Sequence, residues 1–410
     1  MRVLIINTSE TAGGAAIAAG RLVGALNRNG VKAMMLVRDK QTDRITTAAV
    51  GRKMAYKWAF LWERLRIFIA NRLKRTGLWR VDIANAGVDI TNTDEFREAD
   101  VVHLHWVNQG MLSLRQLGRI LDSGKPIVWT MHDMWPCTAI CHYAGQCQKF
   151  HSHCHSCPQL LYPSAHDLSF KTFDAKLKLY QKHHITFVTC SRWLAGQAAQ
   201  SRLLQGQRIL SIPNTYNASV LHPSDMIAAR RHHHLPETGK LLLFACQKVT
   251  NPLKGLDFLL RALPLVKVDG LQLVMVGQLA DSTAAAIPYP IHRIGYIDGE
   301  KEMALLYNAV DAFVTPSLED NLPNTIMEAM AVGTPCIGFN TGGIPEMIDH
   351  ELNGYVARYR DAEDLAQGIS YVLDDTNNSR LAKAATEKAT TVWNEQRVTE
   401  QYIKVYEQIN

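Results

Sequence analysis

The chain has 410 residues, of which 47% are hydrophobic and 20% are charged, and its formal net charge is +6. This balance excludes a disordered chain, and the length predicts roughly two or three domains. No apolar run reaches the roughly 18–20 residues of a membrane span, and the N-terminus MRVLIINTSE has no signal-peptide cleavage site. We therefore expect a cytoplasmic protein whose eight cysteines do not form a disulfide scaffold.

In the first half of the chain, apolar runs alternate with helical patterns. A helix is predicted over 14–30, and buried strands are predicted at 2–8, 31–37, 100–106, 126–132, 185–191 and 208–214. Strands that alternate with helices favour a doubly wound parallel sheet. The polar stretch 215–239, which contains three consecutive histidines, predicts a linker.

The second half repeats the alternation. Strands are predicted at 240–247, 271–277, 291–297, 312–317 and 334–340, and helices at 255–266 and 324–333. We therefore predict an α/β protein with two Rossmann-like domains, 1–214 and 215–392, that face a central cleft. The last helix, 393–410, is expected to pack back on the N-terminal domain. In such sheets, ligands bind at the carboxyl ends of the strands.

The most distinctive motif is PSLEDNLPNTIMEAMAVGTPCIGFNTGGIPEMI, at 316–348. A predicted strand ends at its start, a loop carries Asp320, and the next helix presents Glu328. Loop amides and a helix N-terminus suit an anion such as a diphosphate, and the two carboxylates can accept hydrogen bonds from ribose and sugar hydroxyls. The alternative is that both acids only cap and favour the helix N-terminus. Gly342 and Gly343 allow backbone to approach a ligand closely.

This segment resembles the acid-x7-Glu motif of retaining glycosyltransferases of family 4, which have the GT-B fold. The usual motif has Glu at both ends, whereas Asp320 occupies the first position here. The resemblance implies that Glu328 binds the nucleotide ribose and Asp320 the transferred sugar. It extends over nearly the whole chain. It is closest to members of bacterial exopolysaccharide and colanic-acid-type clusters, through HLHW, WTMHDMWP, the cysteine-rich CHYAGQC segment and SLEDNLPNTIMEAMA.

Lys254, followed by Gly255, resembles the lysine with which the family binds the donor phosphate. The family commonly has an arginine shortly upstream, where this chain has Gln247 or Lys248. An isolated Lys-Gly is otherwise a solvated helix start. With the resemblance, the expected donor-binding residues are Gly13, Gly14, Gln247, Lys248, Lys254, Asn321, Leu322, Asn324, Glu328, Gly342 and Gly343.

Three features of the N-terminal half fit such a site. Gly13 and Gly14 follow the first strand and open a helix, which suits an anionic group, although a plain turn is the alternative. His105, His132 and Asp133 follow later strands. The resemblance implies that His132 positions the donor sugar, so that His132, Asp320 and Lys254 are the expected catalytic residues. His105 and Asp133 are expected on the acceptor side, with a structural histidine as the alternative for both imidazoles.

Five of the eight cysteines lie close together in sequence. Cys141, Cys147, Cys154 and Cys157 have the spacing C-x5-C-x6-C-x2-C, with Cys137 just upstream. Four thiolates that include a CxxC pair suit a tetrahedral structural Zn²⁺. Free or paired thiols and an iron–sulfur cluster remain open alternatives.

The basic character of the chain is concentrated in residues 52–80. They contain nine Lys or Arg side chains and one acid, Glu63, so this segment carries +8 and the remaining residues −2. An apolar stripe at helical spacing comprises Trp58, Leu61, Trp62, Leu65, Ile69 and Leu73, roughly opposite Lys53, Lys57, Arg64, Lys74 and Arg75. Such a segment suits an interfacial helix on anionic lipid. The alternative is a helix packed on its domain with a solvated basic side. No nucleic-acid-binding motif accompanies it.

We therefore expect a retaining glycosyltransferase for bacterial surface polysaccharide. It would move a sugar from a nucleotide-sugar donor to a lipid-linked or oligosaccharide acceptor, peripherally at the inner face of the cell membrane and without a catalytic metal. The resemblance implies a front-face displacement in which the leaving diphosphate assists the acceptor hydroxyl. Two rivals remain, a nucleotide-sugar epimerase of the same fold and a non-catalytic nucleotide-sugar-binding protein.

Overall fold

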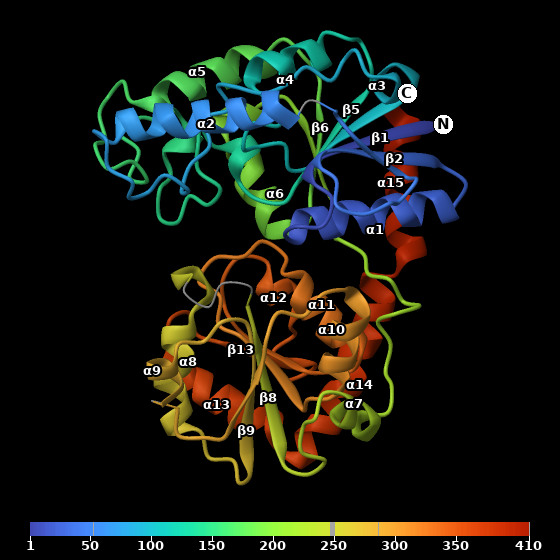
Figure 1. Cartoon of the computed structure of the whole chain (residues 1–410), viewed down its shortest axis with the longest axis vertical. Helices are drawn as coiled ribbons and strands as arrows, with labels where there is room; N and C mark the ends of the chain where they lie inside the picture. Colours follow the sequence, from blue (N-terminus) through green and yellow to red (C-terminus); the bar gives the residue numbers. More distant parts are fainter. Residues whose placement is uncertain (52, 247–250, 286, 410) are drawn as a thin grey trace. The chain divides into compact units, whose positions relative to one another are not determined.

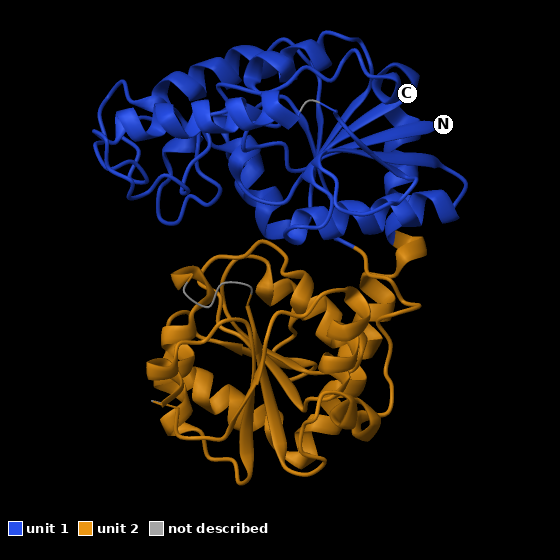
Figure 2. Cartoon of the chain, in the orientation of Figure 1, with its two compact units in different colours: residues 1–214, 398–410 blue, residues 215–397 orange. Residues whose placement is uncertain are grey.

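The computed structural model describes residues 1–51, 53–246, 251–285 and 287–409. The chain forms two compact units: unit 1 comprises 1–214 with 398–410, and unit 2 comprises 215–397 (Figure 2). The last helix is shared, because its residues from Val398 onward belong to unit 1.

Unit 1 contains a seven-stranded sheet in which every neighbouring pair is parallel (Figure 1). Its order is β3-β2-β1-β4-β5-β6-β7. The strands are β1 (Arg2–Ser9), β2 (Lys32–Asp39), β3 (Thr47–Ala49), β4 (Val101–Leu104), β5 (Ile127–Met131), β6 (Thr186–Thr189) and β7 (Arg208–Ser211). The six predicted strands are confirmed, whereas the edge strand β3 is too short to carry a pattern.

Helices cover both faces of this sheet. They are α1 (Gly14–Arg28), α2 (Lys53–Ala70), α3 (Asp94–Glu98), α4 (Leu114–Leu121), α5 (Leu168–Tyr180) and α6 (Arg192–Ala199), with 3-10 turns η1 (Trp135–Cys137), η2 (Lys149–His151) and η3 (Arg202–Leu204). One core contains Trp129 and Phe173, and the core on the other face joins α1 to Tyr402 and Tyr406 of the last helix. A sheet buried on both faces explains the continuous apolar strands.

Unit 2 contains a six-stranded parallel sheet of order β10-β9-β8-β11-β12-β13. Its strands are β8 (Lys240–Ala245), β9 (Leu271–Val276), β10 (Ile291–Ile294), β11 (Ala312–Thr315), β12 (Cys336–Phe339) and β13 (Gly354–Ala357). Its helical elements are α7 (Met226–His232), η4 (Pro252–Lys254), α8 (Leu256–Ala262), η5 (Leu263–Leu265), α9 (Asp281–Ala285), α10 (Glu300–Asn308), α11 (Asn324–Ala331), α12 (Ile344–Met347), α13 (Ala362–Leu373) and α14 (Asp375–Val392), followed by α15 (Glu395–Ile409). The five predicted strands are confirmed, and β13 is additional.

The linker predicted at 215–239 is wrong for its middle, where α7 forms. Asp225 caps this helix by accepting a hydrogen bond from the backbone of Ala228. Arg230 is buried and pairs with Asp311 at 2.8 Å, while its Nε donates to the carbonyl of Ala309. A polar composition cannot reveal such a buried ion pair, because the partner residue lies far away in the sequence.

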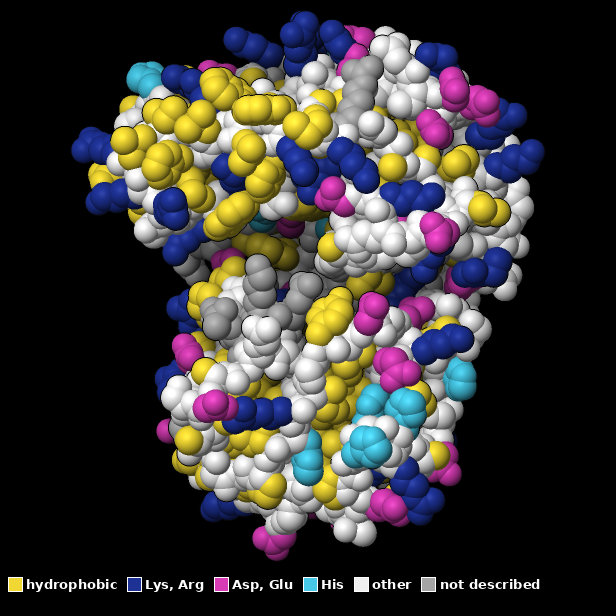
Figure 3. All heavy atoms as spheres, in the orientation of Figure 1, with side chains coloured by type: hydrophobic (Ala, Val, Ile, Leu, Met, Phe, Trp, Pro, Cys, Tyr) yellow, Lys and Arg dark blue, Asp and Glu magenta, His cyan; other side chains and the backbone are white. Residues whose placement is uncertain are grey.

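Helix α2 buries a side of mixed character and leaves its apolar stripe in solvent. Tyr56, Ala59, Glu63, Arg64 and Ile67 are buried, whereas Trp58 is 67% exposed and the other stripe residues are at least 43% exposed. Figure 3 shows hydrophobic side chains gathered over this helix among Lys and Arg side chains. The two predictions for this segment, an interfacial helix and a helix packed on its domain, both placed its basic side chains in water. This is wrong for Arg64, which pairs with Glu63 at 3.0 Å and with Asp82.

Within the described ranges, none of the helices combines the length and the apolarity needed to cross a membrane.

Candidate functional site

The carboxyl edge of the unit 2 sheet brings two predicted residues together. The strand order changes direction between the neighbours β8 and β11, which is where doubly wound sheets bind ligands. The segment after β8 leads to Lys254, and the loop after β11 carries Asp320. The Lys254 Nζ lies 2.9 Å from Asp320 Oδ2. Residues far apart in sequence thus form one ion pair at the edge where a ligand is expected.

Two glycines allow the loops around this pair to approach one another. Gly255 has φ +71°, and a Cβ at this position would lie 1.8 Å from the carbonyl oxygen of Pro316. Gly342 has φ +56°, and a Cβ there would lie 1.7 Å from the carbonyl oxygen of Asp320. Any side chain would displace the backbone at either position. The Gly343 amide also donates to the Asp320 carbonyl at 3.2 Å, so three loops hold Asp320 in place.

The charge of Lys254 is stabilised by its partner. Burial disfavours the ammonium, but the Asp320 carboxylate and its hydrogen bond outweigh this effect and raise the pKa of Lys254. The Lys254 side chain remains 37% exposed. A protonated amine that is fixed in position and still accessible is suited to neutralise an anionic ligand.

The helix that follows, α11, does not use either acid as a cap. Its N-cap residue is Pro323, which makes no side-chain cap hydrogen bond. Asp320 is paired with Lys254, and Glu328 lies beyond the first turn of the helix. The interpretation of these acids as helix caps is therefore wrong. The N-terminal amides of α11 follow the Asp320 loop directly.

Glu328 is largely buried and is held from a neighbouring helix. The hydroxyl of Tyr307 in α10 donates to Glu328 Oε2 at 3.4 Å. Asn321 and Leu322 are also buried in the loop, and Asn324 opens α11. Sequence reasoning missed Tyr307, because an aromatic residue in a helix carries no sign of a polar role. Gln247 and Lys248 lie outside the described residues.

The carboxyl edge of the unit 1 sheet is organised around histidines. His105 follows β4, His132 follows β5, and His105 Nδ1 lies 2.8 Å from His132 Nε2. The other ring nitrogen of His132 lies 3.6 Å from Cys190 Sγ, whose thiol donates to Asn214 at 3.2 Å. His103 is a core histidine between Tyr406 and Thr130, 2.7 Å from each.

These histidines are neutral at physiological pH. Burial lowers the pKa of His132 to about 4, although the Asp133 carboxylate acts in the opposite direction. Burial, together with the two neighbouring histidines, lowers the pKa of His105 well below its usual value. Among the described residues no hydrogen-bond partner is present for the buried His105 Nε2. Neutral imidazoles can orient a hydroxyl by a hydrogen bond, but they do not supply a proton at pH 7.

Asp133 is engaged by three donors of its own unit. Its Oδ1 accepts from the Trp135 amide at 2.8 Å, and its Oδ2 accepts from Trp106 Nε1 at 2.9 Å and from His142 Nδ1 at 2.7 Å. This network indicates a positioning role. His142 also lies 2.6 Å from Asp82. Burial opposes its charge, but the two carboxylates outweigh burial and raise the pKa of His142 to about 10. Asp133 was predicted as a site residue, whereas its partners are scattered in sequence and were not predicted.

The first helix opens at the same edge. Gly13 is the N-cap of α1, with φ +89° and no side-chain cap hydrogen bond, and Gly14 is the first helical residue. A Cβ built on Gly13 would have no heavy atom within 4 Å. The N-terminus of α1 therefore leaves room beside its amides, which is compatible with the predicted anionic ligand.

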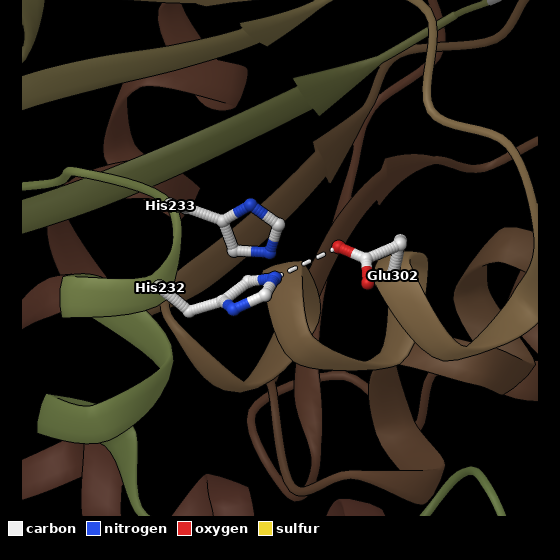
Figure 4. Close-up of side chains that lie close together, drawn as sticks. All are labelled: His232, His233 and Glu302. Carbon is white, nitrogen blue, oxygen red and sulfur yellow. Dashed lines mark hydrogen bonds and ion pairs between the residues drawn. The ribbon is translucent and has the colours of Figure 1, made fainter.

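One compact group of metal-ligating residue types lies elsewhere, on unit 2. Among the described residues, only His232, His233 and Glu302 have ligand atoms that all lie within 4.8 Å of one another (Figure 4). His232 Nε2 is 2.9 Å from Glu302 Oε2, and both side chains are about half exposed. The group joins the end of α7 to α10 as a surface ion pair.

Comparison with known proteins agrees with this architecture. Residues 239–375 match the family model of glycosyl transferases group 1. An uncharacterized glycosyltransferase of Methanocaldococcus jannaschii is 24% identical over 345 residues, which are 75% of this chain and 83% of that protein. The N-acetyl-alpha-D-glucosaminyl L-malate synthase of Bacillus anthracis is 24% identical over 205 residues, or 48% of this chain, and the alignment spans about half (53%) of that enzyme.

Among solved structures, the Anabaena protein HepE in complex with UDP and glucose superposes with a TM-score of 0.66 at 15% identity, and the match covers 100% of both chains. The fold is therefore of the GT-B type, with two Rossmann-like units. The residues that match the family model of glycosyl transferases group 1, 239–375, contain Lys254, Asp320 and Glu328.

Proposed function

We propose that this protein is a retaining glycosyltransferase of family 4 type. It transfers a sugar from a nucleotide-sugar donor to a lipid-linked or oligosaccharide acceptor in the synthesis of a bacterial surface polysaccharide. The single observation that carries the proposal is the ion pair between Lys254 and Asp320 at the strand-order reversal of the glycosyl transferases group 1 domain.

The geometry suggests a role for each residue at this edge. Lys254 and the N-terminal amides of α11 stabilise the diphosphate, both when it binds and as negative charge builds up on it during departure. Glu328, held by Tyr307, accepts hydrogen bonds from the ribose hydroxyls. Asp320 orients the transferred sugar. In unit 1, the neutral His132 orients a hydroxyl.

The proposed reaction is a front-face displacement. The bond between the anomeric carbon and the diphosphate oxygen breaks, and the bond to the acceptor oxygen forms on the same face, so the configuration is retained. The acceptor hydroxyl gives its proton to the departing diphosphate. This route requires no protein base, which agrees with the low pKa of His132, about 4, and with the pairing of Asp320.

A panel of UDP-, GDP- and ADP-sugars tests the donor assignment by thermal shift. UDP-sugars come first because HepE was solved with UDP and glucose. A stabilising donor is then incubated with and without a saccharide acceptor carrying a lipid diphosphate. Acceptor-dependent release of the nucleoside diphosphate and a product with the donor's anomeric configuration are expected. Interconversion of the donor sugar without acceptor would instead identify an epimerase, and binding without turnover would identify a binding protein.

We further propose that α2 docks unit 1 on an anionic membrane surface. The support is the exposed apolar stripe, from Trp58 at 67% to Leu65 at 43% exposure, within a segment of net charge +8. Burial of tryptophan and leucine side chains in the interface, next to basic side chains near the headgroups, favours in-plane binding. A lipid-linked acceptor would lie at the same surface.

Flotation with anionic liposomes at low salt tests this docking. Each basic residue near an anionic surface contributes about 1 kcal/mol, and salt screens the effect. Release is expected for a variant with Gln at Arg66, Arg72, Lys74 and Arg75, and for Trp58→Ser with Trp62→Ser. A matched control places Gln at four exposed basic residues of unit 2, namely Arg261, Lys267, Lys301 and Lys383. If wild-type protein does not bind anionic liposomes, the proposed docking is contradicted. The proposed transferase activity on a water-soluble acceptor is not affected by that result.

A further inference from the structure

Unit 1 contains a long segment with little regular structure, residues 138–167, between η1 and α5. Its helical turn is η2, and a single β-bridge joins Cys141 to Val81 within the described part of the chain. Loops longer than about 12–15 residues without secondary structure are uncommon in compact domains. The backbone hydrogen bonds of strands and helices therefore contribute little to holding this segment.

The four cysteines of this segment surround one small cavity. Cys141, Cys147, Cys154 and Cys157 all line a space of about 20 Å³. Three of them are buried, Cys147 is partly buried, and none is in a disulfide. A cavity of this size holds one water molecule or one ion.

Several polar side chains in the wall of the cavity have partners elsewhere. The hydroxyl of Thr138 donates to the Cys141 carbonyl at 2.6 Å, and that of Ser169 donates to Asp167 at 2.6 Å. The Lys149 ammonium donates to the carbonyls of His155 and Ser156. Sulfur atoms are therefore the principal groups available to an occupant, and soft thiolate ligands favour Zn²⁺ over hard cations.

A buried amine lies beside the cysteines. Lys176 is fully buried, and its amine donates to the carbonyls of Trp135 and Thr138 at 2.6 and 3.0 Å. Burial lowers the pKa of Lys176 to about 7, while Cys137, Cys141, Cys154 and Asp133 act in the opposite direction. A zinc tetrathiolate carries −2, and a buried negative charge of this kind would favour the protonated form of Lys176.

The sulfur atoms are not yet gathered as closely as a bound ion requires. No three of them lie within 4.8 Å of one another, since only His232, His233 and Glu302 meet that criterion in the described ranges. Zinc–sulfur bonds of about 2.3 Å place tetrahedral sulfurs roughly 3.8 Å apart. Binding therefore requires the four sulfur atoms to move closer together.

We propose that Cys141, Cys147, Cys154 and Cys157 bind one structural Zn²⁺ that fixes the segment 138–167. Four thiols lose their protons to solvent, four zinc–sulfur bonds form, and no electron is transferred. Lys176 offsets part of the negative charge. Because Cys141 precedes His142, which holds Asp133, the ion also steadies the network beside His132.

The metal content of full-length protein tests the proposal directly. The protein is produced with zinc in the medium and purified without chelator, and elemental analysis is expected to find one zinc per chain. A mercurial reagent that blocks thiols should release that zinc to a colorimetric chelator and lower the melting temperature. Cys154→Ser combined with Cys157→Ser should abolish the stoichiometric zinc.

Cys137→Ser is the matched control. Its thiol donates to the Met134 carbonyl at 3.2 Å and does not line the cavity, so zinc should be retained. Wild-type protein without zinc, whether its thiols are free or paired, would overturn the proposal. So would iron with visible absorption in place of zinc, or loss of zinc only after replacement of His232 and His233. Wild-type metal content decides the question even if the cysteine variants fail to fold.

Discussion

The carboxyl edges of the two parallel sheets carry different side-chain pairs, one charged and one neutral. In unit 2, the loops after β8 and β11 meet in an ion pair between Lys254 and Asp320, and the lysine is charged and accessible. In unit 1, the ends of β4 and β5 meet in a contact between His105 and His132, which burial keeps neutral. The fold provides the edge in both units, whereas the residues at the loop tips decide what it binds.

The difference assigns a separate chemical task to each edge. A fixed cation beside a helix N-terminus favours a diphosphate, which carries concentrated negative charge. Neutral imidazoles favour hydroxyl groups, because they donate or accept one hydrogen bond without adding charge. Variants that alter one edge and leave a matched feature unchanged test this contrast.

The largest effect is expected from Lys254→Gln. It removes the positive charge that stabilises the leaving diphosphate, so kcat/KM for sugar transfer should fall by about 10²–10³-fold. The control is Lys240→Gln, at the opposite end of β8, where Lys240 pairs with the exposed Asp375. Steady-state transfer assays should show near wild-type turnover for the control. Equal rates for both variants would contradict the assignment of Lys254 to the diphosphate.

A second comparison uses a glycine from each edge. Gly342→Ala places a Cβ into the Asp320 carbonyl and should shift that loop, with a loss of about 100-fold in turnover, because misplacement by about 1 Å has effects of that size. Gly13→Ala meets open space but adds backbone strain of about 1–3 kcal/mol, because φ +89° with ψ 163° is a conformation that essentially only glycine adopts. Circular dichroism and kinetics on both variants check this. If the anion bound mainly at the N-terminus of α1, Gly13→Ala would cause the larger loss of turnover.

Glu328→Gln should weaken nucleotide binding while the fold is kept. Loss of a hydrogen bond to a charged acceptor costs about 1.5–3 kcal/mol, so the Kd for the nucleoside diphosphate should rise about tenfold to a hundredfold. Tyr307→Phe, which removes the hydroxyl that holds this carboxylate, should have a smaller effect of the same sign. Calorimetry measures both, with the exposed Glu387→Gln as control. An unchanged Kd for Glu328→Gln would refute the assignment to the ribose.

The smallest effect concerns the pH dependence of unit 1. Burial lowers the pKa of His103 to about 3, below its unfolded value near 6.5. Between these two pH values, His103 binds a proton in the unfolded state but not in the folded state. Stability is therefore lost as the pH falls below 6.5, by about 2 kcal/mol for this histidine between pH 7 and pH 5. His103→Gln should reduce the loss by that amount, and the exposed His184→Gln should not.

Urea unfolding at the two pH values, followed by tryptophan fluorescence, measures this difference. Seven of the eight tryptophans lie in unit 1, so the signal reports mainly on that unit. His142 contributes with the opposite sign, because its raised pKa stabilises the folded state at low pH, but it is present in every variant and cancels. Identical pH slopes for wild-type protein and His103→Gln would show that His103 becomes charged in the folded state.

Local patterns determined much of the fold. The apolar runs predicted eleven of the strands, because residues buried on both faces of a parallel sheet are continuously hydrophobic and this signal lies within a few consecutive residues. The motif around Asp320 and Glu328 was visible for the same reason, since a strand, a loop and a helix follow one another directly there. The sequence could also indicate Lys254, but only through a family resemblance.

The tertiary structure decided what depends on residues that are distant in sequence. The pairing of Lys254 with Asp320 follows from the adjacency of β8 and β11, which no local pattern encodes. Likewise, the periodicity of α2 defines an apolar stripe but not the side that is buried. The buried side carries Tyr56, Ala59 and Ile67 together with Glu63 and Arg64. Glu63 accepts hydrogen bonds from the amides of Ile83 and Ala84, and Arg64 pairs with Asp82. These contacts form only when distant segments of the chain come together, and they orient α2 so that the apolar stripe faces the solvent.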